Sequence, residues 1–175
     1  MNHKIIFAGP VGAGKTTAIN TISDKPVVTT EAEASDAVKE RKATTTVAMD
    51  FGVLKLDDGT NVHLYGTPGQ QRFDYMWEIL VNGGLGLAIL IDNASDDPLA
   101  DLEFYIESFK TFLAEKPLCV GVTRMDLAPA PRLSDYNKKL AELGIRAPIY
   151  EVDARKSNDV KTLVRSLLYT IAMGG

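Results

Sequence analysis

The chain has 175 residues, 45% of them hydrophobic, and a formal net charge of −4. This size suits one sizeable core, and we predict a single domain over residues 1–175. The acidic balance argues against nucleic acid or an anionic membrane as the main partner. The sequence shows no signal-peptide pattern, no apolar run that could span a bilayer and no lipidation motif, so we expect a cytoplasmic protein without a direct membrane anchor.

Residues 9–16, GPVGAGKT, match the phosphate-binding P-loop pattern G-x-x-x-x-G-K-[ST]. An apolar run at 4–8 predicts a strand before this loop, and residues 16–22 predict a helix after it. The glycine turn then directs backbone N–H groups and the positive end of the helix dipole at one point. We expect Lys15 to face the β- and γ-phosphates and the Thr16 hydroxyl to ligate Mg²⁺. The predicted phosphate-binding residues are Gly9, Gly12, Ala13, Gly14, Lys15, Thr16 and Thr17, unless the loop is a glycine turn that binds nothing.

After this helix, a polar stretch over 24–45 shows little apolar periodicity, which predicts a long functional or mobile loop. Strand patterns over 47–56 and 61–65 flank a D-G turn signal, which predicts an antiparallel hairpin. The periodicity then predicts helices over 73–80, 99–113, 134–143 and 160–171 and strands over 85–91, 118–122 and 149–152. We therefore predict an α/β fold: a three-layer P-loop NTPase domain with a six-stranded, mostly parallel sheet, one antiparallel hairpin strand and five helices.

The second motif, G-T-P-G-Q at 66–70, lies directly after the return strand of the hairpin. A glycine at a strand end can place its N–H near a γ-phosphate, so Gly69 is a predicted nucleotide-binding residue. The residue after it can orient an attacking water, and Gln70 is the predicted catalytic residue in that place. An ordinary Pro-Gly turn is the alternative.

Two further motifs follow the carboxyl ends of predicted strands, where ligands bind in open α/β sheets. In T-R-M-D at 123–126, the Asp126 carboxylate can accept two hydrogen bonds from an edge of guanine that adenine lacks. The planar head of Arg124 can lie against the base, and in D-A-R at 153–155 the Ala154 N–H could meet guanine O6. The alternative for Asp126 is a turn or helix-cap residue. The predicted base-binding residues are Thr123, Arg124, Asp126, Asp153, Ala154 and Arg155.

The order of these motifs resembles that of the Ras-like small GTPases, which carry GxxxxGK[ST], a switch threonine, D-x-x-G-Q, [NT]-K-x-D and S-A-K. The resemblance covers essentially the whole sequence. Residues 44–52, TTTVAMDFG, and 65–70, YGTPGQ, are most similar to the bacterial MglA-like small GTPases. The resemblance implies a switch that binds Mg²⁺ with GTP or GDP and hydrolyses GTP slowly. It also implies a Roadblock-type regulator or another activating or exchange protein as partner.

Three positions depart from the Ras pattern. Gly66 stands where that pattern has an aspartate that helps to hold Mg²⁺ through water, and MglA-like sequences also tend to lack this aspartate. The pair 123–124, Thr-Arg, replaces Asn-Lys, so a hydroxyl stands in place of an amide near guanine N7. Asp153 and Arg155 replace serine and lysine, which leaves Ala154 as the retained side chain.

Spacing within the resemblance also assigns residues of the polar stretch. Ras-like spacing from Gly69 gives Thr44 as the Mg²⁺-binding switch threonine, whereas a Rab-like alignment of the pair at 50–51 gives Thr46. Arg41 lies three residues before Thr44, as in G-protein α subunits that supply an arginine finger in cis. Arg41 is therefore a candidate catalytic residue beside Lys15 and Gln70, and its alternative is an exposed residue in a charged run over 39–42.

The hairpin offers a replacement for the missing aspartate. With 58–59 as the turn centre, Phe51 lies opposite Gly66 and Asp50 opposite Thr67, so strict alternation points Asp50 away from Gly66. Asp50 reaches the Mg²⁺ shell through water only if the strand ends or bulges there. The alternative is that Asp50 caps or solvates the strand edge, and that Thr16, a switch threonine, phosphates and water hold the Mg²⁺.

Three functions stay open on the sequence. They are a GTPase switch whose two loops are ordered by GTP, a GTP-binding scaffold with negligible hydrolysis, and a P-loop ATPase or nucleoside kinase. Gly66 favours the scaffold and Gln70 argues against it. Asp126 argues against the ATPase or kinase, and the GTPase switch is the function we favour.

Overall fold

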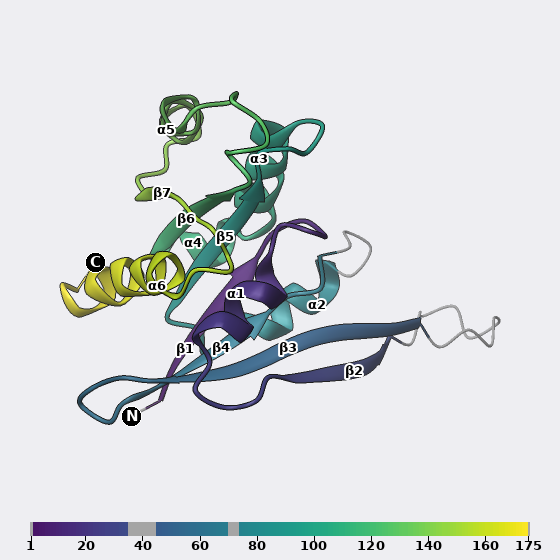
Figure 1. Ribbon diagram of the computed structural model, residues 1–175, viewed down its shortest axis with the longest axis vertical. Helices are drawn as coiled ribbons and strands as arrows, with labels where there is room; N and C mark the ends of the chain where they lie inside the picture. Colours follow the sequence, from purple (N-terminus) through teal and green to yellow (C-terminus); the bar gives the residue numbers. More distant parts are fainter. Residues whose placement is uncertain (1, 35–44, 70–73, 175) are drawn as a thin grey trace.

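One mixed sheet runs through the molecule (Figure 1). The computed structural model describes residues 2–34, 45–69 and 74–174, with side chains for 3–29, 49–69 and 76–174. The strands in these ranges are β1 (Asn2–Ala8), β2 (Val28–Ala34), β3 (Thr45–Lys55), β4 (Asn61–Gly66), β5 (Gly86–Asp92), β6 (Leu118–Thr123) and β7 (Ile149–Glu151). Their order is β2-β3-β4-β1-β5-β6-β7, and β3 runs antiparallel to both of its neighbours.

Helices cover both faces of this sheet (Figure 1). Those in the described ranges are α1 (Lys15–Ile22), α2 (Asp74–Leu80), α3 (Pro98–Ser108), α4 (Lys110–Leu113), α5 (Leu133–Glu142) and α6 (Ser157–Ala172). None of these described helices is long and apolar enough to cross a membrane. The predicted three-layer α/β class is confirmed by this arrangement.

The alternation of side chains along β1 produces two separate cores. Ile5 and Phe7 join the core beneath α1 and α6, whereas Ile6 and Ala8 join the core beneath α2, α3 and α5. All four side chains are fully buried. A strand buried on both faces reads as a continuous apolar run, which is why β1 and β5 were recognisable in the sequence.

The predicted count of six strands and five helices is wrong, because the described residues contain seven strands and six helices. The additional strand, β2, lies inside the polar stretch that we expected to be a loop. It pairs antiparallel with β3 from Val28 opposite Phe51 to Ala34 opposite Thr45. As an edge strand it has one neighbour and needs no apolar face of its own, so its sequence carries only a weak signal.

The additional helix results from a break in the predicted helix over 99–113. Phe109 ends α3 and begins α4, with a φ of −105° that departs from helical geometry. Its side chain is buried in the core beneath α2 and α3. The apolar periodicity continues across the break, which explains why the sequence predicts one helix there.

The register of the β3–β4 hairpin differs from the prediction by one residue. Asp50 lies opposite Gly66 and not opposite Thr67. The turn after Leu56 has three residues: the Gly59 N–H donates to the Leu56 carbonyl oxygen at 2.9 Å, and Gly59 has a φ of +85°. A type I turn followed by a left-handed residue closes a hairpin in this way. Asp50 and Gly66 are therefore on the same face of the sheet.

We expect this register to depend on Gly59. Replacing Gly59 by alanine should lower the free energy of unfolding by about 1 kcal/mol, because an L side chain is strained at this φ. Nothing among the described residues lies within 4 Å of the added Cβ, so the loss is conformational and not steric. Urea unfolding measures it. Gly59→Asn should lose less, since asparagine tolerates the left-handed region, and equal losses in both variants would contradict this account.

Candidate functional site

The P-loop connects the carboxyl end of β1 to the first turn of α1. Gly9, Gly12 and Gly14 all have positive φ, at 147°, 82° and 101°. Gly14 is the N-cap of α1, and no side chain in the described part of the protein caps this helix start. The N–H groups of the first turn, which includes Lys15 and Thr16, are therefore available to an anion.

Lys15 is held inside this loop. Its Nζ donates to the carbonyl oxygens of Gly9 at 2.5 Å and Pro10 at 2.9 Å, and the residue is 8% exposed. Burial lowers the pKa of Lys15 to about 8, although the Asp50 carboxylate acts in the opposite direction. A cation whose charge is poorly solvated gains from an anionic ligand, which a phosphate supplies.

A carboxylate also lies at the start of α1. The Thr16 hydroxyl donates to Asp50 Oδ2 at 2.5 Å, and the Thr29 hydroxyl of β2 donates to Asp50 Oδ1 at 3.0 Å. A Cβ added at Gly66 would lie 3.3 Å from Asp50 Cβ and 3.4 Å from Asp50 Oδ2. The Asp50 side chain thus fills the space beside Gly66, where the Ras pattern would place its own aspartate.

The second motif lies directly against the P-loop. A Cβ added at Gly69 would be 2.7 Å from the Val11 nitrogen and 2.9 Å from Lys15 Nζ, so only glycine allows this approach. The Thr67 N–H donates to the Phe7 carbonyl oxygen at 2.9 Å, which continues the pairing of β1 and β4 beyond the end of β4. The structure therefore brings together Gly69 and Lys15, two of the predicted nucleotide-binding residues.

A cavity of about 830 Å³ joins the P-loop to the two motifs at the ends of β6 and β7. Its walls come from three segments far apart in the chain, at 12–17, 123–127 and 151–159. Predicted binding residues that line it are Gly12, Ala13, Gly14, Thr17, Thr123, Arg124, Asp126, Asp153, Ala154 and Arg155. The cavity thus joins the predicted base-binding residues to part of the P-loop, whereas the predicted phosphate-binding residues Gly9, Lys15, Thr16 and Gly69 do not line it.

Thr123 connects the end of β6 to the P-loop. Its buried hydroxyl lies 3.0 Å from the Ala13 carbonyl oxygen and 3.3 Å from that of Ile91. Ala154 reaches the same loop from the other side, because its Cβ would be 3.0 Å from a Cβ added at Gly14. The segments that follow β6 and β7 are therefore packed directly against the P-loop.

Arg124 is held by a residue that the sequence analysis missed. Its guanidinium NH1 lies 3.1 Å from Asp92 Oδ2, at the end of β5, and its backbone has a φ of +58°. The next residue, Asn93, donates its amide to the carbonyl oxygens of Ala128 at 2.9 Å and Pro131 at 3.1 Å. The available signal was the polar pair Asp92-Asn93 directly after a fully apolar strand, at the edge where ligands bind.

Asp153 and Arg155 form an ion pair with each other at the rim of the cavity. The Arg155 Nε lies 3.0 Å from Asp153 Oδ1, and its NH2 lies 2.9 Å from Asp153 Oδ2. This pairing lowers the pKa of Asp153 to about 2. The Asp153 N–H donates to Asp159 Oδ2 at 2.9 Å, so the first turn of α6 fixes this loop.

Several predicted residues lie outside what the structure describes. Gln70, Arg41 and Thr44 are outside the described residues, and Thr46 belongs to β3 with its side chain outside the described set. Their roles stay predictions. Within the described ranges, no group of three or more His, Cys, Asp or Glu side chains could hold a metal ion.

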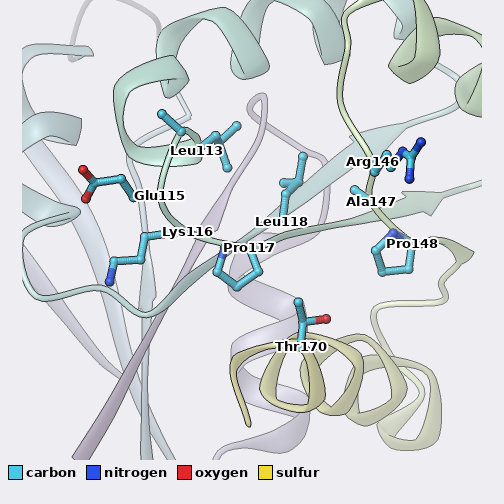
Figure 2. Close-up of a pocket in the computed structure, with 10 residues that line it drawn as sticks. Leu113, Glu115, Lys116, Pro117, Leu118, Arg146, Ala147, Pro148 and Thr170 are labelled. Carbon is cyan, nitrogen blue, oxygen red and sulfur yellow. The ribbon is translucent and has the colours of Figure 1, made fainter. Parts of the chain in front are cut away.

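A second cavity, of about 560 Å³, lies at the opposite end of β6 (Figure 2). Pro117, Leu118 and Pro148 form its apolar wall. Figure 2 shows the side chains of Lys116 and Arg146 on opposite sides of this cavity, so these charges do not converge on one ligand position. The cavity of about 830 Å³ differs in its lining, because glycines, threonines and carboxylates surround it.

The sheet order, the P-loop and the motifs at the strand ends define a P-loop G domain of the Ras-like small-GTPase class. The G domain of the FeoB iron transporter of T. maritima has this fold, with a TM-score of 0.70 and 17% identity, over 98% of this chain and 99% of that one. The chain belongs to the family described as "Conserved hypothetical ATP binding protein", which matches residues 25–173.

Two protein sequences add to this assignment. Mutual gliding-motility protein MglA of Myxococcus xanthus is 26% identical over 190 residues, which cover 100% of this chain and 95% of that protein. An uncharacterized protein of Methanocaldococcus jannaschii is 33% identical over 136 residues, or 77% of each chain. The resemblance to Ras-like, MglA-like small GTPases is confirmed.

The buried Lys15 predicts a pH dependence of stability in the nucleotide-free protein. The folded-state pKa of about 8 lies below the ordinary 10.5, so the unfolded chain binds more protons between these values and stability rises with pH there. The penalty is fully present below pH 8. Relative to Lys15→Met, the wild-type unfolding free energy should therefore increase by about 2–3 kcal/mol between pH 7 and pH 10. Urea unfolding of both proteins measures this difference, and a pH-independent difference would contradict it.

Proposed function

We propose that the chain is a guanine-nucleotide switch, which binds GTP or GDP with Mg²⁺ and hydrolyses GTP slowly to GDP and phosphate. The observation that carries this proposal is the single cavity that joins the P-loop to Asp126 and Ala154. At one end the P-loop residues Gly12, Ala13 and Gly14 line it, next to the buried ammonium of Lys15, and at the other end Asp126 offers a carboxylate. A nucleoside phosphate has the matching polarity, with anionic phosphates at one end and hydrogen-bond donors on a guanine base at the other.

On the phosphate side, the chemistry consists of positioning and charge neutralisation. The N–H groups in the first turn of α1 donate hydrogen bonds to phosphate oxygens. Lys15 supplies a positive charge, and the carbonyl oxygens of the loop already hold its ammonium group in place. The Gly69 N–H serves as the donor for the terminal phosphate, which explains why this glycine lies against Lys15. Gln70 orients the attacking water, and Arg41 is a second candidate for stabilising the developing charge.

On the base side, Asp126 accepts hydrogen bonds from guanine, and the Arg124 guanidinium, fixed by Asp92, covers the base. Thr123 directs its hydroxyl to the P-loop and not to the cavity. It therefore replaces the loop-binding part of an asparagine in this position and supplies no amide for guanine N7. We accordingly expect the base to be recognised mainly through Asp126 and the Ala154 N–H.

Asp50 takes the place of the aspartate that Gly66 lacks. A threonine hydroxyl that donates its proton to a carboxylate turns its lone pairs toward a metal, and Thr16 is oriented in this way by Asp50. Mg²⁺ bound at Thr16 would neutralise charge on the β- and γ-phosphates. The corrected hairpin register supports this role, because it places Asp50 on the face of Gly66 and removes the need for a bulge.

The similarity to MglA supports the switch role and a partner that regulates it. We propose an activating or exchange protein, with a Roadblock-type regulator as the first candidate. The family description names ATP, so an ATP-binding protein is the second candidate function. The matched range begins after the P-loop and includes the base-binding motifs, which makes base selectivity the deciding measurement.

The proposal predicts guanine selectivity that depends on Asp126. We expect GTP and GDP to bind at least about a thousandfold more tightly than ATP, because adenine leaves the carboxylate unpaired. Asp126→Asn should weaken GTP binding and improve the binding of xanthine nucleotides, since the amide presents a donor where the carboxylate accepts. Competition with a fluorescent nucleotide measures all of these affinities.

The matched control for this test is Asp135→Asn, the same change of carboxylate to amide on α5, outside the cavity. It should leave the selectivity unchanged. Comparable affinities of the wild-type protein for ATP and GTP would refute the guanine assignment and favour the ATP-binding alternative.

The role of Asp50 predicts a change in Mg²⁺ affinity. In the GTP-bound protein, Asp50→Ala should raise the Mg²⁺ concentration at half-saturation by about tenfold or more, as loss of a carboxylate that orients a metal ligand commonly does. The control is Asp24→Ala. It also removes a carboxylate that contacts β3, because the Lys55 N–H donates to Asp24 Oδ2 at 2.7 Å. An unchanged midpoint in Asp50→Ala would reject the compensation and leave the nucleotide assignment intact.

A further inference from the structure

A stack of three aromatic rings lies beneath the second motif. Trp77 of α2 stacks on Tyr105 of α3 with ring centroids 5.2 Å apart, and on Phe109 with centroids 5.3 Å apart. Trp77, Tyr105 and Phe109 are only 2%, 1% and 3% exposed. We call these three residues the aromatic stack. Its burial in the core beneath α2 and α3 leaves the rings little freedom to change rotamer.

Both polar atoms of the aromatic stack donate to the backbone of the second motif. Trp77 Nε1 donates to the Pro68 carbonyl oxygen at 3.1 Å, and the Tyr105 hydroxyl donates to the Gly69 carbonyl oxygen at 3.2 Å. Burial raises the pKa of the Tyr105 phenol, so it keeps its proton at any physiological pH. Two donors from one packed stack therefore contact two consecutive carbonyls.

These two carbonyls belong to the two peptide groups on either side of Gly69. Each peptide group is planar, so a hydrogen bond to its carbonyl oxygen also fixes the direction of its N–H. The Pro68 carbonyl shares its plane with the Gly69 N–H, and the Gly69 carbonyl lies in the peptide group that leads to Gln70. Gly69 has no Cβ, so its own conformational preferences restrict it little.

We propose that Trp77 and Tyr105 are positioning residues that fix both peptide groups of Gly69 beside Lys15, so that the Gly69 N–H is preorganised for the terminal phosphate of GTP. This inference rests on the proposed function, because it concerns the phosphate that distinguishes GTP from GDP. A Cβ added at Gly69 would lie 2.9 Å from Lys15 Nζ, so in this proposal the Gly69 N–H and the Lys15 ammonium act on the same phosphate group. If Gly69 were free to change its backbone conformation, this freedom would be lost when GTP binds but not when GDP binds. The entropic cost would then weaken GTP binding alone.

The test compares the affinities for GDP and for a non-hydrolysable GTP analogue in the Mg²⁺-loaded protein. Tyr105→Phe keeps the ring and removes only the hydroxyl, and Trp77→Phe keeps an aromatic ring and removes the indole N–H. Each variant should lower the ratio of analogue affinity to GDP affinity by about fivefold, the scale of one hydrogen bond, with the GDP affinity unchanged. Because the readout is a ratio of binding constants, it does not depend on hydrolysis.

The matched control is Tyr150→Phe, which removes a phenol hydroxyl that lies 3.1 Å from Ser166 Oγ, away from the nucleotide cavity. Tyr150→Phe should leave the ratio of analogue affinity to GDP affinity unchanged. Loss of any hydrogen bond that contributes to stability alone should have the same result. An unchanged or increased ratio in both Tyr105→Phe and Trp77→Phe would overturn the inference while the guanine assignment stands. Failure of the wild-type protein to prefer guanine nucleotides would instead overturn the proposed function itself.

Discussion

The structure depends on the parallel pairing of β1 with a strand on each side. Phe7 lies opposite Gly66 of β4 and Ala8 opposite Ile89 of β5, so three strands end at one edge of the sheet. Parallel strands need long connections, and those that follow these ends form the P-loop, the second motif and the loop that holds Arg124. Polar segments that are distant in sequence therefore meet above an apolar core, and the chemistry of the site follows from backbone pairing before any functional side chain is considered.

The hairpin shows how a site can keep a carboxylate that is supplied from a different position of the sequence. The position across the strand pair from Gly66 carries the carboxylate, because opposite residues of an antiparallel pair have neighbouring Cβ positions. Asp50 approaches Thr16 from β3, and Thr29 of β2 holds its second oxygen. The outer strands of the sheet thereby contribute to the proposed metal site, which the strand ends alone could not complete.

The sequence predicted those parts of the molecule whose signal is local. The P-loop, the apolar strands and the motifs after them combine residue type with an unambiguous period or spacing. Segments 12–17, 123–127 and 151–159, which contain three of these motifs, line one cavity. β2 was missed because pairing with β3, and not its own composition, makes it a strand. The hairpin register was missed because two-residue and three-residue turns share the D-G signal, and the φ of Gly59 decides between them. The roles of Asp92, Trp77 and Tyr105 depend on contacts between distant segments, which no spacing in one sequence reveals.

The space shared by Asp50 and Gly66 has an evolutionary consequence. A side chain at position 66 would begin 3.1 Å from Ile19 Cδ1 and 3.3 Å from Asp50 Cβ, so an ancestor with both carboxylates would crowd two like charges into a site shaped for one. A substitution at either position therefore changes the space and the charge that the other position meets. We expect an aspartate introduced at position 66 to be tolerated better when position 50 loses its carboxylate, because one site then holds one charge. Divergence of this motif among related G domains would then record the history of a pair of residues, not the gradual loss of one.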